Sequence, residues 1–148
     1  MAKITVVYGS TYGNAQQVAE DCELDLLAAG HVAKLVTSPS LNDLTPEQLD
    51  VLLVCTATIG DGEVPDNLYP FYTLLDGAQT AMPWLKYGVI ALGDSGYDDF
   101  AGGGSRMDEA LQGLQAKRIG DVFRVDALEY PDPEDAVKPW LTRWAAKL

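Results

Sequence analysis

The sequence predicts a doubly wound α/β fold, in which five parallel strands form one sheet and helices cover both of its faces. Three observations support this prediction. Short β-branched or apolar runs alternate with segments of helical periodicity along the 148 residues. The central run, residues 51–55, is apolar on both faces, as in a buried parallel strand. Such alternation implies right-handed crossovers that place helices on both sides of a parallel sheet.

The first half of the chain carries three predicted strands and one helix. Residues 3–8 are mostly β-branched and form the first strand. A helix follows from Ala15, because Val18 and Cys22 keep a helical period and Gly30 favours a helix end. The second and third strands are residues 31–37 and 50–56. Their connector is residues 41–48, where residues 45–47 resemble a helical turn with proline at its first position.

The second half continues the alternation. Residues 66–75 are predicted to form a helix that is interrupted or bent near Pro70. Ser105, with Asp108 three residues later, is expected to cap a helix over residues 105–114. The remaining elements are a fourth strand at 85–92, a fifth at 118–125 and a last helix at 133–147. No linker or repeat interrupts this order, so we expect one domain over residues 1–148.

Composition excludes several classes of protein. Hydrophobic residues make up 47% of the chain, which is typical of a globular protein. No apolar run approaches the ~20 residues of a membrane helix, and the N-terminus lacks the pattern of a signal peptide. We therefore expect a cytoplasmic protein that does not enter a membrane.

Charge and cysteine content narrow the choice of partners. The net charge of -12 repels nucleic acid and anionic membranes and favours basic partners, although it also serves solubility alone. The two cysteines, Cys22 and Cys55, lie in different elements, and His31 is the only histidine. We expect buried thiols, without a disulfide scaffold or a His/Cys metal site.

The first candidate site segment joins the first strand to the first helix. Its residues are Gly9, Ser10, Thr11, Tyr12, Gly13, Asn14 and Ala15. Neutral hydroxyl, amide and backbone N–H donors beside a helix start suit a phosphate group. The segment matches neither a Walker loop nor G-x-G-x-x-G. A polar turn with a helix cap is the simpler interpretation.

Two more loops follow the third and fourth predicted strands, where a doubly wound fold binds ligands. The second loop includes Thr56, Ala57, Thr58, Ile59, Gly60, Asp61 and Gly62, and the third includes Leu92, Gly93, Asp94, Tyr97, Phe100 and Ala101. Glycines let a backbone approach a flat ring closely. A tyrosine among small and acidic residues is well placed to stack on such a ring, although a surface tyrosine is the simpler interpretation. The aspartates of the third loop do not recur at a ligand spacing, so we predict no metal site.

Taken in order, the three segments resemble those of the flavodoxin family. Ser-Thr-x-Gly-Asn-Ala is similar to its phosphate loop, and Thr-x-Thr-x-Gly-Asp-Gly-Glu-x-Pro-Asp-Asn and Leu-Gly-Asp-Ser-x-Tyr-x-x-Phe are similar to its two flavin loops. The C-terminal part resembles the short-chain, MioC-type branch, and the motifs also occur in the FMN domains of diflavin reductases. The resemblance implies a flavodoxin-like sheet in the order 2-1-3-4-5, for which flavodoxin is itself the standard example, and one FMN at the switch point.

The resemblance also implies roles for the loop residues. The phosphate would be held by Ser10, Thr11, Tyr12, Gly13, Asn14 and Ala15. Tyr97 would stack on the outer ring face, and Ile59, where many relatives carry an aromatic residue, would cover the inner face. The ring and ribityl edges would be lined by Thr56, Ala57, Thr58, Leu92, Gly93, Asp94, Phe100 and Ala101. The Gly60–Asp61 peptide would turn over when the flavin takes up one electron.

These features predict an electron carrier rather than an enzyme. It would be a low-potential, one-electron carrier and a monomer, with basic-faced redox proteins as partners: a flavodoxin/ferredoxin reductase as donor and an acceptor enzyme. Two alternatives stay open, a small FMN-dependent NAD(P)H or quinone reductase and a flavodoxin-like protein that no longer binds FMN. A phospho-acceptor receiver domain fits poorly, because Thr56 stands where its acceptor aspartate would be.

Overall fold

Strands and helices alternate along the chain in the computed structural model, which describes residues 2–10, 13–59, 62–96 and 100–148. The strands are β1 (Lys3–Gly9), β2 (Val32–Leu35), β3 (Val51–Thr56), β4 (Lys86–Gly93), β5 (Lys117–Arg118) and β6 (Phe123–Asp126). The helices are α1 (Asn14–Ala28), the 3-10 helix η1 (Leu41–Asp43), α2 (Tyr69–Gly77), α3 (Gly102–Gly113) and α4 (Glu134–Ala145).

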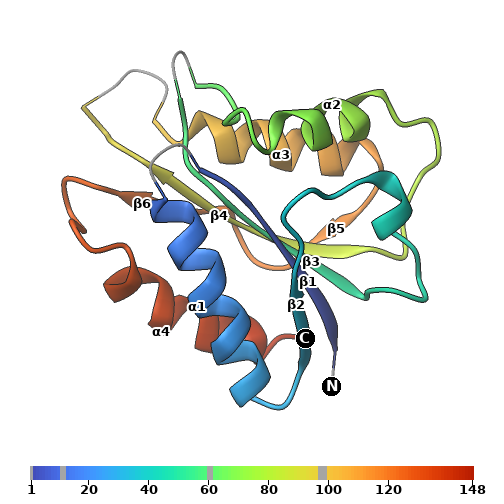
Figure 1. The fold of residues 1–148 in the computed structure, drawn as a ribbon, viewed down its shortest axis with the longest axis horizontal. Coiled ribbons are helices and arrows are strands. Elements are labelled where there is room, and N and C mark those ends of the chain that lie inside the picture. The colour runs from blue at the N-terminus through green and yellow to red at the C-terminus, as the bar shows by residue number, and fades with distance from the viewer. Residues whose placement is uncertain (1, 11–12, 60–61, 97–99) are drawn as a thin grey trace.

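The strands form one parallel sheet in the order β2-β1-β3-β4-β5, and β6 also pairs with β4 (Figure 1). This order confirms the doubly wound fold predicted from the sequence. The order reverses between β1 and β3, because the chain leaves β1 toward β2 on one side and returns to β3 on the other. A crevice for a ligand is expected at the carboxyl ends of the strands at such a point.

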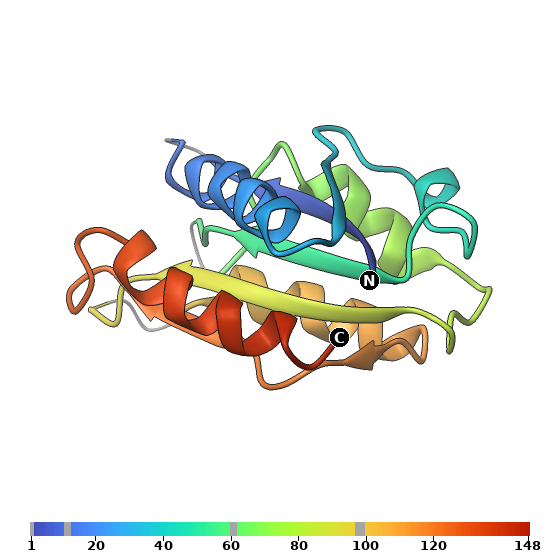
Figure 2. The same cartoon turned by 90° about the horizontal axis from the view of Figure 1, so that it is seen from below.

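Strand β3 forms the centre of the sheet, and all six of its residues are buried. Its neighbours β1 and β4 run beside it in parallel, with Leu53 opposite Val6 on one side and Gly88 on the other. Helices α1 and α4 cover one face and α2 and α3 cover the other, as Figures 1 and 2 show. Apolar side chains on both faces explain why this strand does not alternate in hydropathy.

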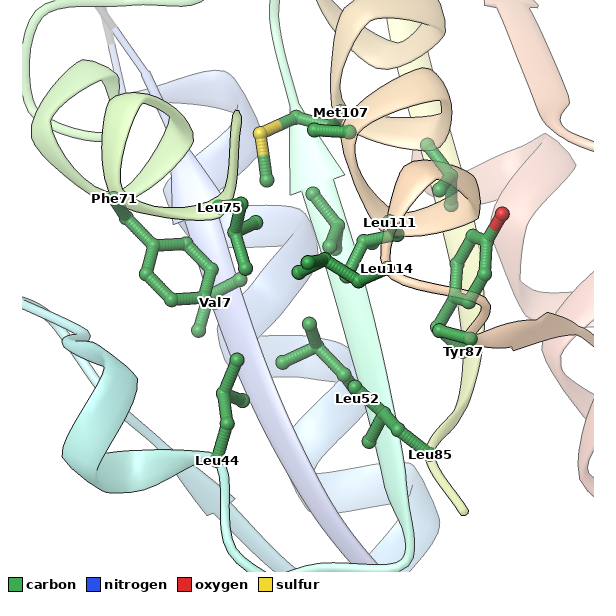
Figure 3. Packing of buried hydrophobic residues seen from close by; sticks show 14 of the residues in the cluster. Val7, Leu44, Leu52, Phe71, Leu75, Leu85, Tyr87, Met107, Leu111 and Leu114 are labelled. Carbon is green, nitrogen blue, oxygen red and sulfur yellow. The ribbon is translucent and has the colours of Figure 1, made fainter. Parts of the chain in front are cut away.

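The core on the α2–α3 side is filled by large aliphatic and aromatic side chains (Figure 3). Phe71 and Leu75 of α2 and Leu111 of α3 are each almost fully buried, as is Leu52 of β3 beneath them. Burial of such side chains contributes about 1.5–3 kcal/mol each, which makes this layer a principal source of stability.

The fifth strand differs from its prediction, because residues 118–125 are divided between β5 and β6. In β4, Tyr87 and Ile90 are three residues apart. Their partners on the other side, Arg118 and Phe123, are five residues apart, so two extra residues bulge out between β5 and β6. The indole N–H of Trp144 donates to the Ile119 carbonyl at 3.1 Å, which takes this carbonyl out of the sheet ladder.

Two predicted helix starts were wrong. Residues 66–68 form a hydrogen-bonded turn from Pro65, and helix α2 begins only at Tyr69, with Pro70 in its first turn, where proline is tolerated. Helix α3 begins at Gly102, three residues before the predicted cap at Ser105. The hydroxyl of Ser105 instead donates to the Ala101 carbonyl from inside the first turn.

The remaining helical predictions differ in smaller ways. The connector forms η1 at residues 41–43, where the Asp43 carboxylate accepts the backbone N–H of Ser40 at 2.8 Å and closes a capping box. The predicted helical turn follows it, because the N–H groups of Gln48 and Leu49 donate to the Thr45 carbonyl at 3.0 and 3.1 Å. The last helix ends at Ala145, two residues before its predicted end, and contains Pro139.

A polar group is buried between α3 and the sheet. The hydroxyl of Tyr87 donates to the Asp108 carboxylate, which also accepts from Arg118 at 2.8 Å. Burial, followed by the contact with Asp108, raises the pKa of Tyr87 well above its ordinary value. Tyr87 therefore remains a neutral hydrogen-bond donor. The buried carboxylate of Asp108 is hydrogen-bonded by Tyr87 and paired with Arg118, as a buried charge requires.

Both thiols are free and buried, which confirms the prediction for Cys22 and Cys55. A hydrogen bond with Cys22, followed by burial, raises the pKa of the Cys55 thiol well above its ordinary value. Because the thiolate is the reactive form, Cys55 behaves as a small apolar core residue.

Replacing Gly104 with alanine should destabilise the fold, because an added Cβ would meet the side chain of Ala91 in β4. We expect a loss of about 1–3 kcal/mol in the free energy of unfolding, as for other overpacked cores. Urea unfolding followed by circular dichroism measures it.

Gly113→Ala is the matched control, since Gly113 ends the same helix with open space around its Cα. This change should leave stability unchanged or raise it by up to about 1 kcal/mol. Equal destabilisation by both changes would contradict this account, because alanine favours a helix more than glycine does and Gly113 has open space around it.

Candidate functional site

The loop after β1 leads into α1 through a left-handed residue. Gly13, at φ +90°, precedes the helix, and its N–H donates to the Ser10 hydroxyl oxygen at 2.8 Å. The first helical hydrogen bond runs from Gln17 to the Gly13 carbonyl, so the N–H groups of residues 14–16 have no partner within the helix. Such groups, with the positive end of the helix dipole, favour an anion.

The predicted phosphate-binding residues contribute through different atoms. Ser10 accepts a bond from Gly13, so its own hydroxyl hydrogen can still be donated outward. Asn14 is exposed, whereas Ala15 is fully buried and can offer a ligand only its backbone N–H. The other two predicted residues, Thr11 and Tyr12, lie outside the described residues.

Asn67 ties this loop to the start of α2. Its side-chain oxygen accepts the Ser10 N–H at 2.8 Å, and its side-chain nitrogen donates to the Tyr8 carbonyl at 3.0 Å. Sequence analysis noted Asn67 within a motif but gave it no role. Its only local signal was an amide five residues after Gly62 and two after Pro65, and its partners lie 57 and 59 residues away.

The loop after β3 is a narrow hairpin. Ile59 and Glu63 exchange two backbone hydrogen bonds, at 3.0 and 2.8 Å. The hydroxyl of Thr58 donates to the Leu92 carbonyl at 3.2 Å and accepts the N–H of Gly103 at 3.1 Å. Thr58 thereby joins this loop to the end of β4 and to the start of α3.

Other predicted ring contacts of this loop differ in exposure. Thr56 is fully buried, and its hydroxyl donates to the Ala57 carbonyl at 2.9 Å, so a ligand at the surface cannot reach this side chain. Ala57 and Ile59 are half-buried at the edge of the sheet. Gly60 and Asp61 lie outside the described residues.

The loop after β4 is anchored by aspartates. Asp94 accepts the N–H of Gly96 at 2.7 Å, and Asp126, at the end of β6, accepts the N–H of Ser95 at 3.1 Å. Hydrogen bonds from the Ser95 side chain, then from its N–H and that of Leu128, hold the pKa of Asp126 below its ordinary value. This carboxylate therefore stays ionised at neutral pH and keeps the loop in place.

The predicted contacts of this third loop are also divided by exposure. Gly93 and Phe100 are half-buried, whereas Leu92 and Ala101 are buried. A Cβ on Gly93 would lie 2.7 Å from the Ala101 nitrogen, so the loop returns directly over the end of β4. Tyr97, predicted to stack on the ring, lies outside the described residues.

The glycines at the start of α3 pack against the second loop. A Cβ on Gly102 would meet the backbone of Gly62 at 2.7 Å, and one on Gly103 would meet the Ala57 carbonyl oxygen at 2.5 Å. The Nε–H of Arg106 donates to the Gly62 carbonyl at 2.7 Å, a charge-assisted bond across the same contact. Sequence analysis assigned no role to Gly102, Gly103 or Arg106, because the helix was predicted to begin only at Ser105, after the two glycines.

The three loops gather at the carboxyl ends of the strands, at one end of the molecule in both views (Figures 1 and 2). Neutral N–H and hydroxyl donors lie at the start of α1, and narrow, glycine-containing backbone lies beside β3 and β4. Donors of this kind fit a phosphate monoester, and closely packed backbone fits a flat ring. The described residues therefore fit an aromatic nucleotide monophosphate such as FMN.

The comparisons agree with this geometry. The family model described as Flavodoxin matches residues 6–140. The chain belongs to the flavodoxin family. It is 41% identical to Flavodoxin YqcA of Escherichia coli K12 over 148 residues, with 100% of this chain and 99% of that protein covered. Members of this family bind FMN and transfer electrons.

Two further comparisons support the same assignment. The chain is 35% identical to Protein MioC of Escherichia coli K12 over 144 residues, which cover 97% of each chain. A structure of a C101A mutant of flavodoxin from Pseudomonas aeruginosa matches with a TM-score of 0.87 and 40% identity, over 97% of this chain and 96% of that one. The resemblance to the MioC-type branch is thus confirmed.

Other features lie away from this site. A cavity of about 600 Å³ lies between the C-terminal halves of α1 and α4, near the amino ends of the strands, and contains none of the predicted site residues. In the part of the chain that the structure describes, no three His, Cys, Asp or Glu side chains cluster as metal ligands would. Of the helices in that part, none is long and apolar enough to span a bilayer.

Asn67→Ala should weaken FMN binding more than it weakens the fold. The change removes both hydrogen bonds that hold the first loop against α2, and each contributes about 0.5–1.5 kcal/mol. Asn67 is exposed, so little packing is lost. We expect the Kd for FMN, measured by quenching of flavin fluorescence, to rise about tenfold.

Asn42→Ala is the control for this change, because Asn42 is also exposed but lies in η1, outside the three loops. Its Kd for FMN should match that of the unchanged protein. An Asn67 variant with unaltered FMN affinity would mean that the first loop keeps its shape without this amide.

Proposed function

We propose that the chain holds one FMN at the carboxyl edge of its sheet and carries electrons one at a time between a reductase and acceptor redox enzymes. One observation carries the proposal: the loops after β1, β3 and β4 lie together at this edge, and each is held by a hydrogen bond to a neighbouring segment, the first to Asn67, the second to Gly103 and the third to Asp126. We call these three loops the cradle. We infer that the whole chain, residues 1–148, acts as one FMN-binding domain.

The phosphate would lie at the start of α1. The N–H groups of Asn14, Ala15 and Gln16 and the hydroxyl of Ser10 would donate to its oxygens, with no lysine or arginine in the loop. Thr11 and Tyr12 are predicted to complete this shell. The flat ring would lie between the Ile59 hairpin and the third loop, with Tyr97 predicted on its outer face.

FMN, when bound, supplies the redox chemistry, and the protein controls its energetics. Carboxylates around the cradle, among them Glu63, Asp66 and Asp94, oppose added negative charge on the ring. A carboxylate about 6 Å from the ring, at an effective dielectric near 20, raises the free energy of adding one negative charge to the ring by ~3 kcal/mol before screening by salt. These residues therefore favour a low reduction potential.

The partners that this proposal favours are basic-faced redox proteins, with a flavodoxin/ferredoxin reductase as donor. The net charge of -12 attracts such faces and repels nucleic acid and anionic membranes. The same charge opposes self-association, so we propose that the carrier works as a monomer. We also propose that it works in the cytoplasm. Among the described residues of the three loops, we find no substrate pocket with a general acid and a general base, which is what an enzyme would need.

Titration of the flavin-free protein with FMN tests the proposal. We expect quenched flavin fluorescence and a shifted blue absorption band that saturate at one FMN per chain. Because carriers react only through partners, the loaded protein should oxidise NADPH only when a reductase is added. No binding at micromolar FMN would favour a fold that has lost its cofactor, and steady NADPH oxidation without a reductase would favour a small FMN-dependent reductase.

A further inference from the structure

Leu128 is the most exposed large apolar side chain among the described residues. It is 66% exposed and lies in the segment that follows β6. Single exposed leucines are common on protein surfaces and need no explanation by themselves. Three properties of its surroundings distinguish this one: its position beside the site, the rigidity of its backbone and the charge around it.

The position of Leu128 is beside the third loop of the cradle. A Cβ built on Gly96 would lie 4.0 Å from Cδ1 of Leu128. The segment after β6 and the loops after β1, β3 and β4 lie at the same end of the molecule in both views (Figures 1 and 2). A protein that approaches the cradle from this end therefore meets Leu128.

The backbone beneath Leu128 is fixed by hydrogen bonds. Asp126 accepts the N–H of Leu128 at 3.0 Å and that of Ser95 at 3.1 Å. The Ala127 N–H donates to the Gly93 carbonyl at 2.8 Å, and the Tyr130 N–H donates to the Asp126 carbonyl at 2.8 Å. We call residues 126–130 the Leu128 turn. A side chain presented on such an ordered turn loses little backbone entropy when it binds a partner.

The surface around the Leu128 turn is strongly acidic. Residues 126–135 contain Asp126, Glu129, Asp132, Glu134 and Asp135 and no lysine, arginine or histidine. Asp94 of the third loop adds a carboxylate beside Gly96. The nearest arginine in sequence, Arg124, points toward α3, where it donates to the Ser105 hydroxyl at 3.3 Å.

This combination of charges selects among possible occupants. A second copy of the chain would bring a second net charge of -12 against the same acidic surface, which costs free energy. A basic protein face would be attracted, and an apolar recess within it would cover Leu128. Interfaces commonly take this form, with a small apolar anchor inside a polar rim.

We propose that the Leu128 turn is a docking surface for basic-faced redox proteins, with Leu128 as its apolar anchor. This inference rests on the proposed carrier function and adds to it a residue that selects partners. The acidic rim speeds the encounter, while Leu128 sets how long the complex lasts, because apolar contacts are not screened by salt.

The test measures reduction of the FMN-loaded protein by a purified NADPH-dependent flavodoxin reductase in a stopped-flow instrument. Leu128→Ala should raise the apparent Kd for the reductase about tenfold or more, the effect of losing an interface hot spot. The difference should persist at high salt, where the contribution of the acidic rim is lost. FMN affinity and melting temperature should not change, because Leu128 buries little surface in the free protein.

Leu24→Ala is the matched control, since Leu24 is 62% exposed but lies on α1, outside the Leu128 turn. Its apparent Kd should remain within about twofold of that of the unchanged protein. Equal reduction of the Leu128→Ala variant and the unchanged protein would overturn the docking proposal alone. An unchanged protein that holds FMN but accepts no electrons from the reductase would overturn the carrier function and the docking surface together.

Sedimentation of the FMN-loaded protein tests the competing occupant. A single monomeric species across concentrations supports a surface that is left free for partners. A dimer that Leu128→Ala dissociates would assign the anchor to contact between copies and would overturn the proposal.

Discussion

Backbone packed directly on backbone, where the start of α3 meets the second loop, is the contact on which the candidate site depends. Gly102 lies against Gly62, and Gly103 lies against the Ala57 carbonyl, too close for any side chain to intervene. The Thr58 hydroxyl bridges the same contact, with bonds to Gly103 and to the end of β4. The loop after β3 is thus held in a fixed position relative to the end of β4 and the start of α3.

The polar side chains of the cradle mainly hold the loops, which leaves backbone groups to face a ligand. Asn67 and Asp126 fix the first and third loops as Thr58 fixes the second. A site built in this way needs little reorganisation to bind FMN, and binding then costs less conformational entropy. The same ties extend outward to the Leu128 turn, where Asp126 joins the third loop to the surface that a partner would meet. Cofactor binding and partner docking would therefore share one rigid framework.

Sequence patterns predicted the fold where local residues determine it. The parallel sheet with helices on both faces and the buried β3 followed from alternation and from an apolar central run, whereas the strand order followed from the resemblance to the flavodoxin family. The division of β5 from β6 did not, because it depends on Trp144, which bonds Ile119 from 25 residues away. The start of helix α3 was predicted too late, because glycine disfavours helices and Gly102, Gly103 and Gly104 were left outside it. Close packing of the helix start against its neighbours requires glycine at these positions. In the site, the loops were predictable from topology, but Asn67 and Arg106 act on partners 57 and 44 residues away, which no local pattern reveals.

Amide hydrogen exchange on the flavin-free protein tests most directly whether the chain itself builds the cradle. The informative amides are those of Ser10, Ser95 and Gly103, each donated to a side chain of another segment. A preformed cradle predicts exchange at least about tenfold slower than in an unfolded peptide before any FMN is added. Exchange at the unfolded rate that slows only when FMN binds would mean that the cofactor, rather than these hydrogen bonds, assembles the site.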